Sequence, residues 1–264
     1  MKILIFKVRQ FISANVLPFL GIGSIAKRKQ VSYKYLKGQG IEIGALHFSL
    51  PVKKGVTVKY VDAISYEEAV EKFPELSPSK IVKPHYIDDG FTLSTIEENS
   101  QDFVIANHVL EHSPNPVGVL INWMRVLKKQ GLIYFSVPLA EKCFDRGRVI
   151  TQVNHLFEDH TLVEQGDAKQ FDSRNREHYK EWINISEVNM RHMRGEPSPK
   201  LSQEEFQERV NVFSKDKVEI HFHTFSVESI KDFISELEKT LGNLRAIDIV
   251  ESKTEVIAVL QKAS

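Results

Sequence analysis

The stretch IEIGALH, residues 41–47, decides how the first part of the chain folds. It predicts a buried strand that stops at Gly44, with a carboxylate, Glu42, inside the strand and His47 just beyond its end. A carboxylate within an apolar strand is costly unless it is paired or hydrogen-bonded. A glycine lets the chain turn sharply and lets a ligand approach the backbone. We expect a ligand-binding loop here, although a plain turn and a protein partner for Glu42 explain the same residues.

Strand-like apolar runs alternate with helical patterns over the first half of the chain. The runs lie at 40–45, 56–62, 79–87, 102–108 and 131–138. Ser65 and Glu68 have the spacing of a capping box, which predicts a short helix that ends near Phe73. Apolar residues recur at helical spacing over 117–129. Because the strands are nearly all apolar, we expect an α/β fold with a parallel sheet covered on both faces.

The second half divides into an insertion and a return to the sheet. Residues 139–218 are rich in charge, histidine and aromatic side chains, and we interpret them as a helical insertion that caps the substrate. An extended run, a helix and two strands are predicted at 218–225, 226–241, 244–252 and 254–262. The tight connection between the last two makes them antiparallel. The main domain is therefore expected to comprise residues 31–138 and 219–264.

Composition restricts the classes of function. The formal net charge is +0, which gives no electrostatic argument for nucleic acid. The single cysteine, Cys143, excludes an internal disulfide and fits a reducing compartment, so we expect a cytoplasmic protein. Residues 1–30 carry only basic charges and predict an amphipathic segment. That segment either packs on the domain or lies on the inner face of an anionic membrane.

The residues that follow each predicted strand are the candidates for ligand binding, because ligands of open parallel sheets sit beyond the carboxyl ends of the strands. These candidates are Gly44, Ala45 and His47 after the first run, Asp62 after the second, Asp88 and Asp89 after the third, and Asn107, His108, Glu111 and His112 after the fourth. An acid at the position of Asp62 suits ribose hydroxyls, and Asp88 and Asp89 suit an adenine amino group. A helix cap at Asp62 and an ordinary turn at 88–90 are the alternatives.

Two pairs of histidines raise the question of a metal. His108 and His112 are four residues apart, a spacing that places two imidazoles on one helix face, and His221 and His223 share one face of an extended run. The sequence supplies no unmistakable third ligand. We therefore predict no metal site, and the histidines stay candidates for acid–base chemistry.

Taken in order, these elements resemble the class I S-adenosylmethionine-dependent methyltransferases of the methyltransferase type 11 group. The resemblance is carried by IEIGA (41–45), VKYVD (58–62), DFVIANHVLEH (102–112) and LINWMRVLKKQGLIYFSVP (120–138). It implies a Rossmann-like sheet of seven mostly parallel strands with an antiparallel C-terminal strand, and S-adenosylmethionine as cofactor. A closer likeness is to bacterial methyltransferase-domain proteins associated with glycan synthesis.

The resemblance also implies roles for the first loop. Glu42 is expected to hold the amino-acid end of the cofactor, directly or through water, and Gly44 to admit it. The family's first motif has further glycines, whereas this chain has Leu46 and Phe48 at those positions. The methionine end of the cofactor is therefore expected to contact Ala45, Leu46 and His47.

The reaction implied by the resemblance is methyl transfer to a small-molecule or glycan acceptor, with oxygen the favoured atom. A hydroxyl acceptor needs a base, and a histidine suits that role near neutral pH. The candidates are His112, His108 and, from the insertion, His155. Two alternatives stay open. One is an NAD-dependent oxidoreductase on a related fold, although the chain lacks G-x-G-x-x-G. The other is a non-catalytic binding or membrane-associated module.

Overall fold

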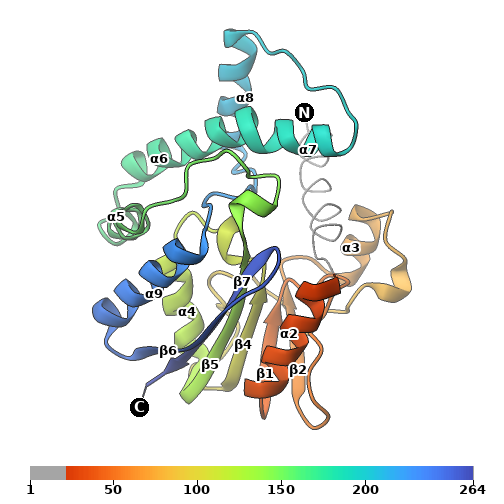
Figure 1. The fold of residues 1–264 in the computed structure, drawn as a ribbon, viewed down its shortest axis with the longest axis vertical. Coiled ribbons are helices and arrows are strands. Elements are labelled where there is room, and N and C mark those ends of the chain that lie inside the picture. The colour runs from red at the N-terminus through yellow and green to blue at the C-terminus, as the bar shows by residue number, and fades with distance from the viewer. Residues whose placement is uncertain (1–21, 264) are drawn as a thin grey trace.

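The computed structural model describes residues 22–263, which form a sheet of seven strands with helices on both faces (Figure 1). The strand order is β3-β2-β1-β4-β5-β7-β6. The strands are β1 (Gln39–Ile43), β2 (Thr57–Asp62), β3 (Tyr86–Ile87), β4 (Gln101–Asn107), β5 (Leu127–Pro138), β6 (Leu244–Glu251) and β7 (Glu255–Lys262). The pairs among β1 to β5 are parallel, and β7 is antiparallel to both of its neighbours. The predicted mostly parallel sheet with a reversed C-terminal strand is confirmed.

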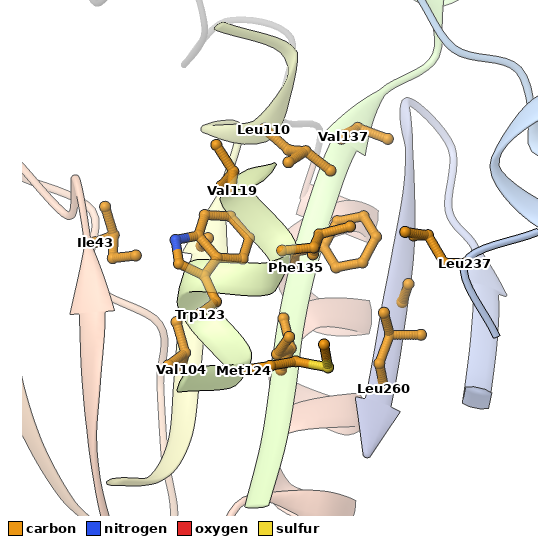
Figure 2. Close-up of a cluster of buried hydrophobic side chains, with 14 of the residues drawn as sticks. Ile43, Val104, Leu110, Val119, Trp123, Met124, Phe135, Val137, Leu237 and Leu260 are labelled. Atoms are coloured by element: carbon orange, nitrogen blue, oxygen red, sulfur yellow. The ribbon is translucent and has the colours of Figure 1, made fainter. Parts of the chain in front are cut away.

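The two faces of the sheet have separate cores. On one face, α4 (Pro116–Val126) and α9 (Val227–Leu241) pack against alternate side chains of the strands, and Figure 2 shows Trp123 of α4 lying against this face. On the other face, Val31 of α2 (Ile22–Tyr35) belongs to a cluster with Phe103 and Tyr134. Because successive side chains of a strand alternate, Glu42 faces α2 and not α4.

Two helices begin and end where the sequence predicts. In α3 (Tyr66–Lys72), Ser65 and Glu68 make both bonds of the capping box, and Phe73 is the C-cap. In α9, Ser226 is the N-cap, and Gly242 ends the helix in the left-handed conformation at φ +69°. A full capping box, of Ser202 and Glu205, also begins α8 (Gln203–Lys215). These ends are set by side chains close in sequence, which is why they are predictable.

Two predicted elements are wrong in extent. The strand expected over 79–87 is reduced to β3, because Pro78–Lys80 form a 3₁₀ turn and Pro84 has no N–H for a ladder. The helix expected over 117–129 ends at Val126. Leu127 is fully buried and pairs with Gln101 of β4, so β5 starts four residues earlier than the run 131–138 indicates.

The insertion, residues 139–218, is helical and lies beyond the carboxyl ends of the strands in Figure 1. Its longer helices are α5 (Val153–Glu164), α6 (Ala168–Glu181), α7 (Glu187–Met193) and α8. It has its own apolar core, which includes Trp182 and Phe213. The return segment, residues 218–224, attaches it to the sheet, because the N–H groups of Phe222 and His223 both donate to the Glu111 carbonyl (2.8 and 3.3 Å).

The basic N-terminal segment is described only from residue 22 onward, where it forms the first part of α2. There Arg28 is buried against the domain. Residues 1–21, on which the prediction of membrane contact depends, lie outside the described residues. Of the helices in 22–263, none has the length and apolar character needed to cross a membrane.

Candidate functional site

The loop after β1 has the shape of a ligand-binding turn. Gly44 has φ +65°, and a Cβ added there would meet no atom closer than 3.5 Å, so the space above it is open. Leu46 has φ +43°, the left-handed conformation that glycine adopts most easily. The loop therefore keeps a glycine-like backbone without the glycine. Ala45 is buried, and both ring nitrogens of His47 are buried without a hydrogen-bond partner among residues 22–263.

Glu42 has a protein partner. Its side chain is almost fully buried, and both carboxylate oxygens accept the backbone N–H of Leu50 (2.9 and 3.1 Å), which closes the loop back onto β1. Burial raises the pKa of Glu42 to about 7, although the Leu50 N–H and the nearby Arg28 act to lower it. The alternative left open by the sequence, a structural partner, is thus present, and any cofactor contact of Glu42 is additional to it.

Asp62 is the last residue of β2, and its carboxylate accepts few hydrogen bonds. The hydrogen bond from the Ile64 N–H to its Oδ1 is long, at 3.4 Å, and the N-cap of the following helix is Ser65. Asp62 is therefore not the helix cap. Burial raises the pKa of Asp62, and Glu219 of the return segment raises it further. A partly buried carboxylate that lacks strong donors suits the two hydroxyls of a ribose.

The two acids after β3 differ in availability. Asp88 is buried, and its oxygens accept from the N–H of Asp89 (2.8 Å), the hydroxyl of Ser94 (2.9 Å) and both the N–H and the hydroxyl of Thr95 (2.8 Å each). Burial acts to raise the pKa of Asp88, but these donors outweigh it and hold the pKa below its usual value. The acceptor capacity of Asp88 organises the loop, which argues against the predicted adenine contact. Asp89 is exposed and makes one bond, from the Phe91 N–H (2.7 Å).

Asn107 and His108 end β4 beside the first loop, since Ala106 pairs with Ile43 of β1. The Oδ1 atom of Asn107 accepts from the Ser136 hydroxyl (3.0 Å), while its Nδ2 is buried close to the Glu42 carboxylate, whose pKa the Asn107 side chain acts to lower. His108 has φ +54°, a conformation that is strained for a residue with a side chain. Such strain persists where the surroundings fix the residue.

His108 is fixed by a buried ion-pair network. Its Nε2 lies 2.8 Å from Oε2 of Glu255, the first residue of β7. Glu255 in turn accepts from Arg28 of α2, whose Nε lies 2.8 Å from Oε1. Burial acts to raise the pKa of Glu255, but His108 and Arg28 outweigh it and lower the pKa to about 2. The carboxylate is therefore ionised and holds the His108 ring in one orientation.

His112 lies in a different environment. It is buried, its Nδ1 lies 3.1 Å from the Ile220 carbonyl, and its ring packs edge-on against His221 at 4.6 Å between centroids. Burial lowers its pKa well below the ordinary value, and His221 lowers it further. These contacts match the alternative of a packing histidine. The structure argues against His112 as the base, and it separates His112 from His108.

His155 lies farther away still, on α5 in the insertion. Its Nε2 faces Nε2 of His178 on α6 at 3.0 Å, and its Nδ1 lies 2.8 Å from Nη2 of Arg174. The three predicted bases thus occupy three separate sites. Of the three, only His108 is at the carboxyl end of a strand beside the first loop.

Two residues of the site, Glu255 and Arg28, were missed by sequence reasoning, and both orient His108. Glu111, a predicted strand-end residue, is fully buried with neither carboxylate oxygen hydrogen-bonded in the described part of the chain. Burial raises the pKa of Glu111, and its Oε1 lies 4.0 Å from Nε2 of His221. Glu255 directly precedes the apolar run VIAVL, and this position is only a weak indication of a functional role. Nothing in the sequence distinguishes Arg28 from its basic neighbours.

The comparison with protein families identifies the type of domain. Residues 40–135 match a family model described as a methyltransferase domain. The match runs from β1 into β5 and contains all the strand-end loops described above. Over this stretch the chain is similar to a methyltransferase domain. Its enzyme class is accordingly that of the S-adenosylmethionine-dependent methyltransferases, its cofactor is S-adenosylmethionine, and the oxidoreductase alternative is not supported.

Solved structures are similar to this chain only at low sequence identity. A SAM-dependent methyltransferase from Aquifex aeolicus has 13% identity and a TM-score of 0.45, with 92% of each chain covered. The plantazolicin methyltransferase BpumL, in complex with SAH, has 11% identity and a TM-score of 0.45, with 92% of this chain and 83% of that chain covered. A structure described as a candidate Zn-dependent alcohol dehydrogenase from Rhodobacter sphaeroides has 11% identity and a TM-score of 0.49, with 90% of each covered. At such scores the enzyme class rests on the family match.

No curated protein matches the sequence of this chain with significance. The residues at the strand ends nevertheless fit the cofactor. A Cβ at Gly44 would meet no atom closer than 3.5 Å, Asp62 lacks strong donors, and the buried ring nitrogens of His47 have no hydrogen-bond partner in residues 22–263. Unsatisfied buried polar groups are uncommon in folded proteins unless something else binds them. Open space next to such groups is what a polar ligand requires.

Proposed function

We propose that this methyltransferase methylates a hydroxyl oxygen of a sugar, a glycan or another small hydroxylated acceptor. The observation that carries the proposal is the His108–Glu255 pair at the end of β4. S-adenosylmethionine, when bound, supplies an activated methyl group. A hydroxyl is a weak nucleophile, so the protein must also provide a base that takes its proton.

The geometry supports His108 as the base. Because Glu255 is ionised, it accepts the proton on Nε2 of His108 and leaves Nδ1 as the acceptor for a second proton. Arg28 keeps Glu255 in place through two atoms of its guanidinium. The pairing of Ala106 with Ile43 puts His108 next to the Gly44 loop, where the cofactor is proposed to bind.

The remaining strand-end residues divide the binding of the cofactor between them. Asp62 is proposed to accept the ribose hydroxyls, and the exposed Asp89 to accept from the adenine amino group. Ala45, His47 and Asn107 are proposed to line the methionine end, with Glu42 acting through the loop that it closes. The polar insertion beyond these strand ends supports a hydroxylated acceptor, and the glycan-associated resemblance supports a cytoplasmic sugar substrate.

The test is methyl transfer by the purified full chain to nucleotide sugars and glycans, with S-adenosylmethionine as donor. Changing His108→Asn is expected to lower kcat by about 10²- to 10⁴-fold, the usual contribution of a general base, while binding of S-adenosylhomocysteine is retained. The residual rate of the variant should rise steeply with pH as hydroxide replaces the base. His192→Asn, at an exposed position on α7, is the matched control.

Two results would contradict the proposal. An unchanged kcat in His108→Asn would exclude this residue as the base. Methylation of amines with no transfer to any hydroxylated acceptor would exclude the oxygen chemistry.

A further inference from the structure

A second group of histidines lies inside the insertion and is not used by the proposed reaction. His155 and Asp159 are four residues apart on one face of α5, His178 is on α6, and His223 is on the return segment. One ligand atom from each of these four side chains lies within 4.8 Å of the other three. Nε2 of His155 is 3.0 Å from Nε2 of His178 and 3.0 Å from Oδ2 of Asp159. Four good metal donors thus converge on one point.

Several of these donors lack a full set of hydrogen-bond partners. Asp159 is fully buried, and Nε2 of His155, which lies 3.0 Å from its Oδ2, also faces Nε2 of His178 at 3.0 Å, so one ring proton cannot serve both contacts. His223 is 1% exposed, and neither of its ring nitrogens makes a hydrogen bond within residues 22–263, although the Pro114 carbonyl is nearby. A buried polar group without a partner costs about 1–3 kcal/mol, and more if it is charged. Two such groups aimed at one point indicate a missing binding partner.

From this geometry we propose that His155, Asp159, His178 and His223 bind one divalent transition-metal ion, of which Zn²⁺ is the first candidate. Three imidazoles and one carboxylate are borderline ligands that zinc accepts readily. Four protein ligands fill a tetrahedral shell, which is the pattern of a structural and not a catalytic zinc site. The inference does not depend on the acceptor or on His108.

A hydrogen-bonded cluster explains the geometry less well. An N–H···N bond between His155 and His178 accounts for their 3.0 Å contact but leaves Oδ2 of Asp159 and both nitrogens of His223 without hydrogen bonds in the described chain. A bound ion would satisfy Oδ2 of Asp159 and one nitrogen of His223, and the Pro114 carbonyl lies near that ring as a partner for the other nitrogen. Arg174 already fixes the other oxygen of Asp159, Oδ1, and so acts as an outer-shell partner.

Ion binding requires His155 to change its tautomer. A guanidinium can only donate, so the 2.8 Å contact of Arg174 Nη2 with Nδ1 of His155 places the proton of that ring on Nε2. When Nε2 binds the ion, the ring proton must be on Nδ1. Arg174 Nη2 must then turn toward the His155 carbonyl, which it already approaches at 3.2 Å. The neutral ring thus exchanges its Nε2 proton for one on Nδ1, and no net proton is released from it.

The proposed ion would link separate segments of the insertion. The ion would join α5, α6 and the return segment, whose N–H groups bind the Glu111 carbonyl just after β4. It would thereby hold the insertion in place over the carboxyl ends of the strands. This gives a structural role to His155, which the sequence offered as a base.

The test is Zn²⁺ binding by the full chain, measured by competition with a chromophoric chelator after the protein has been stripped of metal. One equivalent is expected. Asp159→Asn and His223→Gln should each weaken binding by more than about 100-fold, because even outer-shell partners account for 10- to 100-fold. His192→Gln, which changes an exposed histidine outside the cluster, should bind as the wild type does.

A second readout guards against misfolded variants. Adding Zn²⁺ should raise the Tm of the stripped wild type and of His192→Gln, but should not change the Tm of Asp159→Asn. The far-ultraviolet circular dichroism of Asp159→Asn must match that of the wild type, which shows that the variant is folded. Failure of the stripped wild type to bind Zn²⁺, Co²⁺, Mn²⁺ or Fe²⁺ would overturn the proposal. Equal affinity in the wild type, Asp159→Asn and His223→Gln would overturn it as well.

Discussion

Two buried groups of histidines and carboxylates in this protein differ in how complete they are. At the end of β4, His108, Glu255 and Arg28 satisfy one another, and Glu255 is fully buried. Between α5 and α6, Asp159 and His223 are as deeply buried, yet one oxygen and two nitrogens lack a hydrogen bond within 22–263. The first group is completed by the chain. The second requires something that the chain does not supply.

This difference distinguishes buried charges that stabilise the fold from buried groups that bind a ligand. A buried charge is tolerated when its partners are present, and removal of one partner leaves the other uncompensated. A buried donor set without partners is tolerated when a ligand binds it. The same distinction separates Asp88, which has several donors, from Asp62, which has one long hydrogen bond.

The largest expected effect comes from breaking the complete group. Glu255→Ala leaves Arg28 buried without its carboxylate, and such a change costs about 3–5 kcal/mol of the free energy of unfolding. Urea denaturation measures it. Glu251→Ala, at an exposed position on β6, is the matched control and should change stability by less than about 0.5 kcal/mol. A loss in Glu255→Ala no larger than that of the control would show that the network is not stabilising.

Glu42 sharpens the comparison, because it is buried with only one backbone donor, Leu50. Its pKa rises from 4.5 to about 7 on folding, so the folded state favours the protonated form. Its contribution to stability is complete below about pH 4.5 and is lost as the pH rises through 7, by about 3 kcal/mol. Glu42→Gln should therefore make the free energy of unfolding less dependent on pH between about 5 and 8.

The measurement is urea denaturation of wild type and Glu42→Gln at a series of pH values, with the two curves subtracted. The opposite sign is expected for Glu255, whose lowered pKa makes its contribution disappear as the pH falls from about 4.5 toward 2. Parallel curves for the wild type and Glu42→Gln would mean that Glu42 is not titrating in this range.

The smallest effect tests the incomplete group. In protein stripped of metal, His223→Phe should change the free energy of unfolding by no more than about 1 kcal/mol in either direction, because it replaces a ring without hydrogen bonds by an apolar one of similar shape. Urea denaturation in the presence of a chelator measures it. A loss as large as that of Glu255→Ala would show that His223 is already satisfied by the protein.

Local signals made much of the fold predictable from the sequence. The capping box at Ser65, the stop at Gly242 and the alternation of apolar runs all act over a few residues, and each was found where predicted. The extent of β3 and the start of β5 depend on pairing with distant strands, so the sequence pattern misplaced them.

The site was less predictable than the fold. Strand ends could be located, but whether an acid is free or occupied depends on loops that fold back over it, as at Asp88 and Glu42. The network around His108 joins residues 28, 108 and 255, and no local pattern reveals such a contact. The histidine cluster of the insertion escaped notice for the same reason, since its members come from three separate segments.

The most direct test of the account is calorimetric titration of the full chain with S-adenosylhomocysteine, for the wild type, Asp62→Ala and Asp232→Ala. Asp232 lies at an exposed position on α9, so its change should leave the affinity unaltered. Asp62→Ala should weaken binding by about 100-fold or more, because two charge-assisted hydrogen bonds to the ribose are lost. Wild-type affinity in Asp62→Ala, or no binding by the wild type, would contradict the placement of the cofactor at the carboxyl ends of β1 and β2.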